Sequence, residues 1–234
     1  LMSVNVVVDE HLNKNLRPKY EKLIKSLYKS FPVSKSPITK EGVNFSGNRD
    51  VERHRWFYYK EAYSQSVVER FLLDNNIGEG EWILDPFSGV GTTLLECQKK
   101  KIYSVGFDMS PLPCFVTKVK TDYYSKDDIE FAKNYLKKLN KNSRESLDIP
   151  PYKKFFEFYS KEVASDLLRI KRFYELCGNE KIRNLFKLGY LSLAGDHSSR
   201  VKDGNGLKKR KNYSPPETIL PLFKDKILEY FGDI

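Results

Sequence analysis

The spacing of apolar side chains predicts where the first helices of the chain lie. Between residues 10 and 31 they recur every three or four positions, as in an amphipathic helix, although Pro18 interrupts the pattern near its start. Residues 32–50 lack such spacing and contain proline, serine and glycine, which indicates a loop. Helical spacing returns over residues 64–73, where Ser64 is of a type that caps helices.

A different pattern follows, in which short apolar runs alternate with helical segments. Residues 81–85 and 102–107 are such runs, each ending in turn residues, and we expect both to be strands. Residues 92–101 and 111–120 have the spacing of helices. The order strand, helix, strand, helix is typical of a parallel sheet with helices packed on it.

The remainder of the chain has a helical pattern and predicts no further strand. We expect helices over residues 126–141, 153–176, 179–194 and 217–231. A complete doubly wound sheet needs more than two strands, so either the sheet is abbreviated or its remainder lies on another chain. The sequence thus predicts an α/β fold in three regions: a helix and loop over 1–50, the βαβ region over 51–125, and a helical region with a basic loop over 126–234.

Composition and charge narrow the class of partner. Lysine and arginine number 41 against 31 acidic residues, a net charge of +10 that favours a polyanion, nucleic acid before a membrane surface. The alternative is a soluble protein that is simply rich in lysine. No apolar run approaches the roughly 18 residues of a membrane span. Cys97, Cys114 and Cys177 show no paired spacing, so we expect no metal site, no disulfide and a cytoplasmic location.

A glycine-rich turn, DPFSGVGTT at residues 85–93, connects the first predicted strand to its helix. Gly89 and Gly91 let the backbone turn sharply and approach a ligand, and the following helix presents free N–H groups. Asp85 stands at the carboxyl end of the strand, where open α/β sheets bind ligands. The spacing is neither GxGxxG nor GxxxxGK[ST], and an acidic residue in the turn would repel a pyrophosphate.

The acidic residues of this region suit a nucleoside that carries an amine. Asp85 can pair with a cationic amine, and Asp108 ends the second predicted strand, where a carboxylate can accept hydrogen bonds from ribose hydroxyls. Together with the glycine turn they describe S-adenosylmethionine. Purely structural alternatives stay open: the glycines could serve only a tight turn, Thr92 or Thr93 could cap the helix, and Asp108 could be a surface turn residue.

These motifs resemble those of a known family. DPFSGVGTT is similar to the cofactor-binding motif of DNA amino-methyltransferases, which methylate cytosine N4 or adenine N6, and VGFDMSP resembles their next motif, whose acidic residue contacts the ribose. RWFYYKEAYSQSVVERFL is similar to the segment that packs over the methionine moiety, although Trp56, Phe57 and Tyr59 could equally belong to the core. The resemblance covers residues 50–120, and residues 186–211 resemble a stretch of cytosine-N4 members.

The resemblance implies a partial Rossmann-like methyltransferase sheet with an added helical region, S-adenosylmethionine as cofactor and duplex DNA as substrate. The residues that it assigns to the cofactor are Asp85, Pro86, Phe87, Gly89, Gly91, Thr92, Thr93, Asp108, Met109, Tyr59, Lys60 and Ser64.

The family's catalytic motif, [DNS]-P-P-[YFW], has no close counterpart in the chain. Ser214-Pro215-Pro216-Glu217 carries glutamate in place of the aromatic residue that stacks on the flipped base, and residues 148–152, DIPPY, contain an inserted isoleucine. Neither follows an apolar strand, so we expect both to flank helices. The catalytic residues are therefore unassigned. We expect either that the polypeptide continues or, in preference, that a complementary chain brings an SPPY or DPPY motif.

The basic charge concentrates in residues 197–211, which we expect to form a glycine-containing loop that binds DNA phosphates. The candidate contacts are Arg200, Lys202, Lys208, Lys209, Arg210 and Lys211. The alternative is a solvated loop without a partner.

The leading interpretation is the cofactor-binding subunit of a DNA methyltransferase from a restriction-modification system, cytosine-N4 slightly before adenine-N6, inactive alone. Two alternatives stay open: a self-contained RNA or protein methyltransferase that uses Ser214, Pro215 and Pro216, and a non-enzymatic DNA-binding module.

Overall fold

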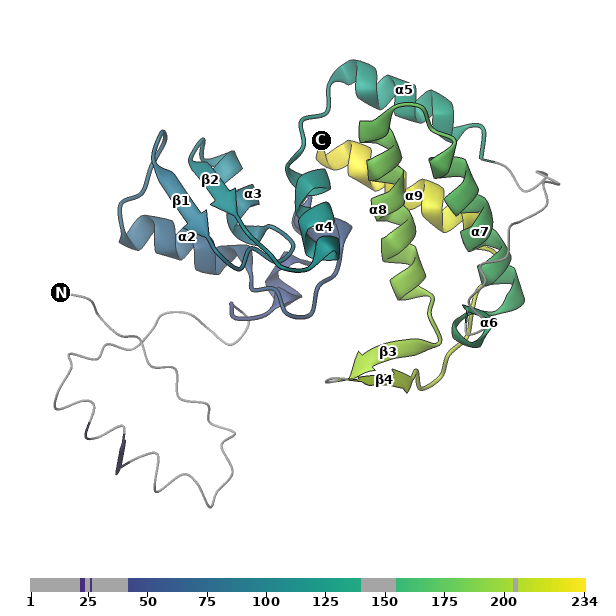
Figure 1. Cartoon of the computed structure of the whole chain (residues 1–234), viewed down its shortest axis with the longest axis horizontal. Helices are drawn as coiled ribbons and strands as arrows, with labels where there is room; N and C mark the ends of the chain where they lie inside the picture. Colours follow the sequence, from purple (N-terminus) through teal and green to yellow (C-terminus); the bar gives the residue numbers. More distant parts are fainter. Residues whose placement is uncertain (1–21, 24–25, 27–41, 140–154, 204–205) are drawn as a thin grey trace.

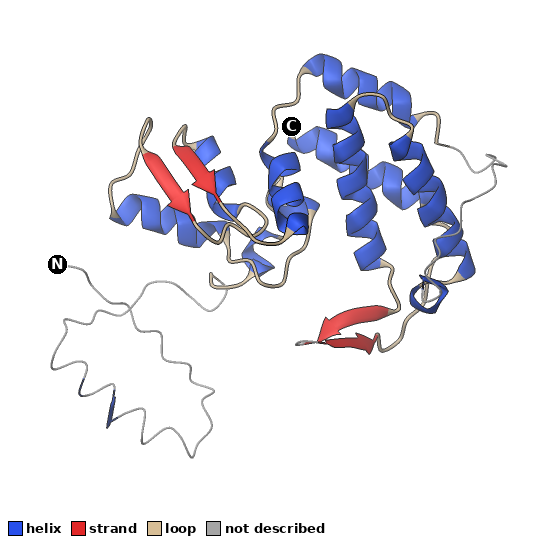
Figure 2. Ribbon diagram, in the orientation of Figure 1, coloured by secondary structure: helices blue, strands red, loops and turns tan. Residues whose placement is uncertain are grey.

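The computed structural model describes residues 22–23, 26, 42–139, 155–203 and 206–234 (Figures 1 and 2). Lys22, Leu23 and Ser26 are helical, and the rest of the expected N-terminal helix lies outside the described residues. The DIPPY segment at 148–152 also lies outside them.

The βαβ pattern is confirmed element by element. The structure has two 3₁₀ turns, η1 (Phe45–Asn48) and η2 (His54–Trp56), followed by α2 (Gln65–Asp74), β1 (Trp82–Asp85), α3 (Thr92–Lys99), β2 (Tyr103–Gly106) and α4 (Pro111–Thr121). Ser64 caps α2, because its hydroxyl accepts a hydrogen bond from the backbone N–H of Ser66 at 3.4 Å.

The two strands of this region form a parallel pair with Trp82 opposite Tyr103 and Asp85 opposite Gly106. One face is covered, since Val68 and Leu72 of α2 pack with Cys97 of α3 in a small buried cluster that Ile83 also contacts. The architecture is therefore mixed α/β, and within the described residues the parallel sheet has two strands.

The second half of the chain is mainly helical, as expected. It contains α5 (Lys126–Leu136), α6 (Phe155–Phe158), α7 (Lys161–Glu175), α8 (Glu180–Asp196) and α9 (Leu220–Asp233). The predicted helix over 153–176 is divided in two, because Ser160 is extended and its hydroxyl caps α7 by accepting from Val163 N–H at 3.2 Å. The predicted helix over 217–231 begins only at Leu220.

The basic segment is a hairpin, which corrects the expectation of a loop and of no strand after residue 125. β3 (Arg200–Asp203) and β4 (Gly206–Lys209) pair antiparallel, with Arg200 opposite Lys209. The apolar periodicity that marks a buried strand is absent because every residue of β4 is exposed. The hairpin is attached to the helical region through Ser199, whose N–H donates to the carbonyl of Phe158 at 2.7 Å.

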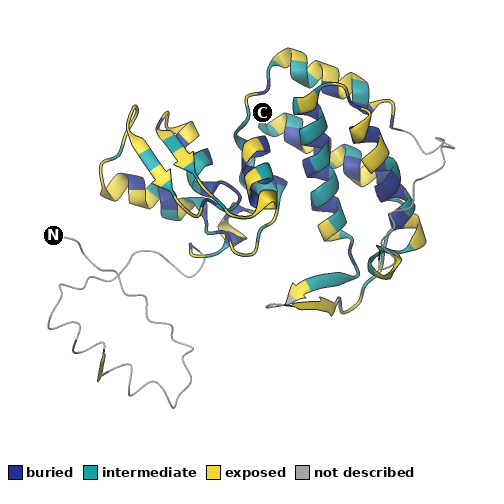
Figure 3. Cartoon of the chain, viewed as in Figure 1, coloured by how far each residue is buried: buried dark blue, intermediate teal, exposed yellow. Residues whose placement is uncertain are grey.

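The main core joins both halves of the chain around Trp56. This side chain is fully buried, stacks on Tyr230 of α9 with ring centroids 4.5 Å apart, and donates its Nε1–H to Asp233 at 2.8 Å. Figure 3 shows that buried positions concentrate in the helical half, whereas β1 and β2 carry exposed ones. A single cluster of buried side chains extends from Phe45 to Tyr230 and so includes residues from two of the three predicted regions. The division of the chain into three regions stays a prediction.

We expect Asp233→Ala to lower the free energy of unfolding by about 1–3 kcal/mol, because the buried indole N–H of Trp56 would lose its acceptor. Chemical denaturation followed by tryptophan fluorescence measures the change. Asp225→Ala, at an exposed position of the same helix, is the control and should change the free energy by less than about 0.5 kcal/mol. Equal losses in the two variants would contradict this role of Asp233.

Candidate cofactor site

The turn after β1 has the backbone geometry that its glycines suggested. Gly89 and Gly91 both have positive φ, 51° and 81°, and Gly91 is the N-cap of α3. A side chain at Gly91 would be obstructed as well as strained, because its Cβ would lie 2.8 Å from Cγ2 of Thr117. The N-terminus of α3 is thus held close to α4, and only glycine fits at this point of the turn.

Asp108 ties the end of β2 to the glycine turn. Its Oδ2 accepts a hydrogen bond from Gly89 N–H at 3.0 Å, and its Oδ1 accepts one from Ser110 N–H at 2.8 Å. Ser88 N–H donates to the carbonyl of Phe107 at 2.8 Å and closes the same junction. Asp108 is therefore an integral part of the turn, with its carboxylate fixed beside Gly89.

Asp85 is held by Tyr63, a residue of the segment that resembles the methionine-side segment of the family but one that the sequence did not pair with Asp85. The hydroxyl of Tyr63 donates to its Oδ2 at 2.9 Å, while Phe87 N–H donates to its Oδ1 at 3.0 Å. The Tyr63 hydroxyl also lies 2.5 Å from Oγ1 of Thr93. Burial raises the pKa of Tyr63 to about 12, so the phenol keeps its proton at neutral pH. Because a phenol has one proton, Thr93 donates to Tyr63 and Tyr63 donates to Asp85.

The other predicted cofactor residues occupy different surroundings. Tyr59 lies beside the turn, with its Cε1 4.0 Å from where a Cβ of Gly89 would stand, and burial, Glu61 and Asp108 raise its pKa. Phe87 and Met109 are 82% and 102% exposed, whereas Ser64 is buried as a helix cap. Thr92 is also buried, and Pro86 and Lys60 are exposed. Their roles toward a cofactor stay predictions.

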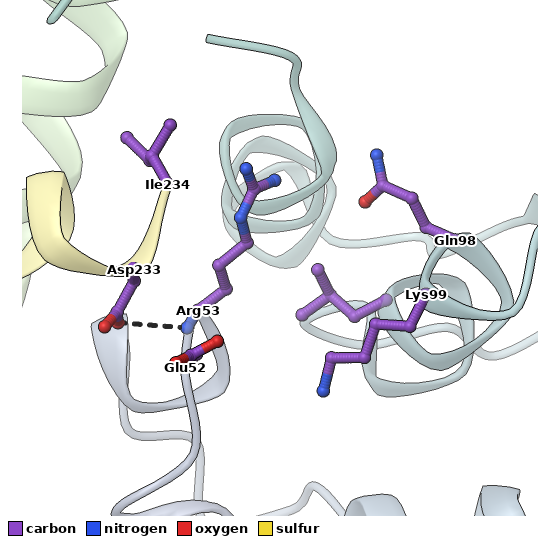
Figure 4. A pocket seen from close by; sticks show the side chains of 7 residues that line it. Glu52, Arg53, Gln98, Lys99, Asp233 and Ile234 are labelled. Carbon is purple, nitrogen blue, oxygen red and sulfur yellow. Dashed lines mark hydrogen bonds between the residues drawn. The ribbon is translucent and has the colours of Figure 1, made fainter.

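Two pockets lie near this region. The first, of about 210 Å³, lies between α2 and β1 and reaches Asp85; its lining residues are Tyr63, Val67, Val68, Phe71, Leu72, Ile83, Leu84, Asp85 and Thr93. The second, of about 260 Å³, lies where η2, α3 and α9 meet (Figure 4), and Asp233 within it accepts a hydrogen bond from Arg53 N–H at 3.1 Å. The second pocket contains none of the predicted cofactor residues.

A cluster of ionisable groups, largely buried, surrounds Glu96 of α3, the helix that follows the glycine turn. Glu96 of α3 accepts hydrogen bonds from His54 and Lys99, each at 2.7 Å. Burial acts to raise the pKa of Glu96, but those two hydrogen bonds outweigh it and leave the pKa below its usual value. Burial lowers the pKa of His54, so the imidazole is neutral at pH 7. Lys120 donates to the carbonyl of His54 at 3.0 Å, and complete burial lowers its pKa to about 7.

The candidate DNA contacts fall into two groups on the hairpin, exposed lysines and partly buried arginines. Lys208, Lys209 and Lys211 are exposed, and Lys202 forms an ion pair with Glu61, close to Tyr59. Arg210 instead donates to the carbonyl of Gly195 at 3.1 Å and is partly buried. Arg200 is partly buried as well, at the start of β3.

The Ser214–Glu217 segment is fixed to the helical region. It lies outside the helices and strands, and the residues after it are anchored by Asp166 of α7, which accepts from Thr218 Oγ1 at 2.6 Å and from Ile219 N–H at 2.9 Å. Ser214 does not end a strand of the parallel sheet.

The described residues contain neither a group of metal ligands nor a membrane-spanning helix. Within them no three histidine, cysteine or acidic side chains gather as metal ligands would. In the same residues no helix combines the length and apolar character needed to cross a membrane.

Comparison with known proteins gives a consistent set of relatives. The N6/N4 DNA methylase family model matches residues 9–118. The chain is 26% identical over 206 residues to the Type II methyltransferase M.BsoBI of Geobacillus stearothermophilus, covering 82% of this chain and 38% of that protein. It is 33% identical over 166 residues to M.MjaII of Methanocaldococcus jannaschii, 66% of this chain and 31% of that protein. It is 35% identical over 75 residues to M.AvaI of a Nostoc species, 32% of this chain and 16% of that protein.

The matched part of the chain therefore spans between 16% and 38% of the length of these relatives. No solved structure matches it significantly.

We expect the stability of the protein to rise with pH between about 7 and 8.5, in part through Lys120. Its pKa is about 7 when folded and near 10.5 when unfolded, so the unfolded chain binds more protons in this range. Lys120→Met should lower the slope of the free energy of unfolding against pH by up to about 1.4 kcal/mol per pH unit. Denaturation at several pH values measures this slope. Lys118→Met, at an exposed position of the same helix, should leave the slope unchanged. Parallel curves for wild type and Lys120→Met would contradict the lowered pKa.

Proposed function

We propose that the chain belongs to the N6/N4 family of DNA methylases and that it binds S-adenosylmethionine for the methylation of an exocyclic amine in DNA. We place cytosine N4 before adenine N6 as the target, because residues 186–211 resemble a stretch of the cytosine-N4 enzymes. The observation that carries the proposal is the pair of carboxylates, Asp85 and Asp108, that meet at one glycine turn.

The two carboxylates match the two polar parts of the cofactor. Each oxygen of Asp85 is engaged by one donor, from Tyr63 or Phe87, and keeps a second lone pair for the ammonium group of the methionine moiety. Asp108 has the same spare capacity for a ribose hydroxyl. Because both carboxylates are already fixed, binding costs little side-chain entropy. When bound, S-adenosylmethionine supplies a methyl group on a sulfonium.

The apolar residues around the turn suit the rest of the ligand. Phe87 and Met109 are largely exposed next to the two carboxylates, and the Tyr59 ring lies beside Gly89. We assign these side chains to the adenine and methionine parts, because burying their exposed apolar area against a ligand is favourable. Free N–H groups at the start of α3 add donors at the same place.

We assign the catalytic step to residues outside these 234. Holding the protons of an exocyclic amine needs acceptors next to the methyl donor, and the Ser214–Glu217 segment is anchored on α7 instead. We infer that β1, α3, β2 and α4 begin a wider Rossmann-like sheet, and that a complementary chain brings the SPPY or DPPY motif. In this proposal the chain alone transfers no methyl group, and it acts in the cytoplasm on duplex DNA.

The hairpin is the part that we assign to DNA. Lysines 208, 209 and 211 are exposed on this segment, and a group of exposed basic side chains suits binding to the phosphate backbone. Arg210 and Arg200 are more engaged with the protein, and we give them the role of holding the hairpin in place.

Calorimetry with S-adenosylmethionine tests the cofactor site. We expect Asp85→Asn to weaken binding about 10–150-fold, because a charged hydrogen bond to the ligand amine is lost. Tyr63→Phe should weaken it less, about 2–12-fold, since it removes only the hydroxyl that orients Asp85.

The control is Asp127→Asn, an exposed acidic residue of α5 that should leave affinity unchanged. Absence of binding by the wild-type chain, or equal affinity of wild type and Asp85→Asn, would refute the site.

Salt-dependent binding to a duplex oligonucleotide tests the hairpin. We expect the double variant Lys209→Gln, Lys211→Gln to bind more weakly to every sequence tried, and its log–log salt slope to be shallower by about 2, near one per lost phosphate contact. Lys126→Gln with Lys137→Gln, exposed lysines at the first residue and the C-cap of α5, is the charge-matched control. An unchanged salt slope in the hairpin variant would show that the DNA contact lies elsewhere.

A further inference from the structure

The hairpin carries a large apolar side chain among its basic ones. Leu207 of β4 is 57% exposed, and Lys208 and Lys209, which follow it in the strand, are exposed as well. A single exposed leucine is ordinary on a protein surface, so exposure alone assigns it no role. Its place in the hairpin is what distinguishes Leu207.

The strand register puts Leu207 on a basic face. Lys202 lies opposite Leu207, and Arg200 lies opposite Lys209. Residues directly opposite each other share a face of a sheet, as do residues two positions apart along one strand. We call Arg200, Lys202, Leu207 and Lys209 the basic hairpin face.

The basic hairpin face is turned toward the glycine turn. Lys202 forms an ion pair with Glu61, two positions after Tyr59. The positive charge of Lys202 also acts on the Tyr59 phenol, opposing the rise in pKa that burial causes. Tyr59 in turn has its Cε1 4.0 Å from where a Cβ of Gly89 would stand. The hairpin thus brings Leu207 and its basic neighbours to the side of the molecule that is proposed to hold the methyl donor.

A duplex presents a physical problem to an enzyme that modifies a base. The exocyclic amine reaches a methyl donor only when its nucleotide leaves the base stack. Unstacking costs a few kcal/mol per step, and some DNA-binding proteins offset it by inserting an apolar side chain between base steps. Leu207 has the required character, because it is apolar, exposed and next to cations that can hold the phosphates on either side.

We propose that Leu207 is a wedge that enters the base stack of duplex DNA beside the nucleotide that leaves it. Lys208 and Lys209 hold the adjoining phosphates, and contact of the leucine with bases offsets part of the cost of unstacking. The inference rests on the proposed function and adds to it the way in which the hairpin handles the duplex.

Charge favours DNA over a protein as the partner of Leu207. Its neighbours Lys208 and Lys209 are cationic, and so are three of the four residues of the basic hairpin face. Lysine is depleted in protein–protein interfaces, whereas it is enriched where a protein contacts phosphates. The net charge of +10 favours a polyanion in the same way.

Binding to two short duplexes of the same sequence, one of them with a single abasic site, tests the wedge. An abasic site leaves a gap in the stack, so insertion there no longer has to displace a base. We expect the full chain to prefer the abasic duplex at least about 5-fold. Leu207→Ser should bring the ratio of the two affinities close to one.

Matched variants separate insertion from phosphate binding. Leu207→Met should keep the preference, because methionine is apolar and of similar volume. Leu228→Ser, at an exposed leucine of α9, should keep it as well. Lys209→Gln should weaken binding to both duplexes equally. The salt slope of Leu207→Ser should equal that of the wild type, since no phosphate contact is lost, which shows that its hairpin is still formed.

A fluorescent base reports insertion directly. The emission of 2-aminopurine depends on stacking, so this base is placed beside the abasic site. We expect the wild type and Leu207→Met to change its emission on binding, and Leu207→Ser to leave it close to that of the free duplex. A merely structural role of Leu207 would not produce this difference.

The outcomes that overturn the wedge differ from those that overturn the proposed function. Equal affinity of the wild type for both duplexes, or a preference that persists in Leu207→Ser, would overturn the wedge and leave phosphate binding by the hairpin intact. Absence of binding to either duplex at low salt would overturn the role of the hairpin in DNA binding together with the wedge.

Discussion

The structure depends on one short segment, residues 53–56, that joins the helical half of the chain to the glycine turn. Trp56 fastens the segment to α9 through its stacking on Tyr230 and its hydrogen bond to Asp233. His54 fastens it to α3 through Glu96 at 2.7 Å. Arg53 adapts to both contacts with a positive φ of 60°, a strained conformation that persists only where the surroundings impose it.

This junction explains why buried charge is found so close to the candidate site. α3 begins at the glycine turn, so holding Glu96 in its middle also fixes the direction of its N-terminus. The carboxylate is buried with two hydrogen-bond donors, which repay part of its desolvation. Loss of Lys99 would remove the ion-pair partner of the carboxylate, and loss of His54 would remove one of its two hydrogen-bond donors, so either loss would weaken the support of the turn. The position of Asp85 relative to Asp108 thus depends on packing far outside the turn.

The sequence predicted the βαβ unit because its signals are local. The apolar runs, the glycines and the Ser64 cap each act within a few residues, and the structure places them as expected. The hairpin was missed because its strands are held by backbone pairing and by Ser199, without an apolar alternation to mark them. Tyr63 was missed as a partner of Asp85, because contacts across 22 positions leave no spacing in the sequence.

The uncovered sheet face is compatible with stability because the main core lies elsewhere. Trp56, Phe186 and Phe223 are fully buried in a cluster built mainly from helices, whereas the sheet contributes little to it. The helical half can therefore hold the two strands although one face of their sheet is exposed. The glycine turn is fixed in a different way, because Asp85 and Asp108 accept hydrogen bonds from Phe87 N–H and Gly89 N–H at the carboxyl ends of the strands. The geometry of the turn therefore does not depend on a covered sheet face.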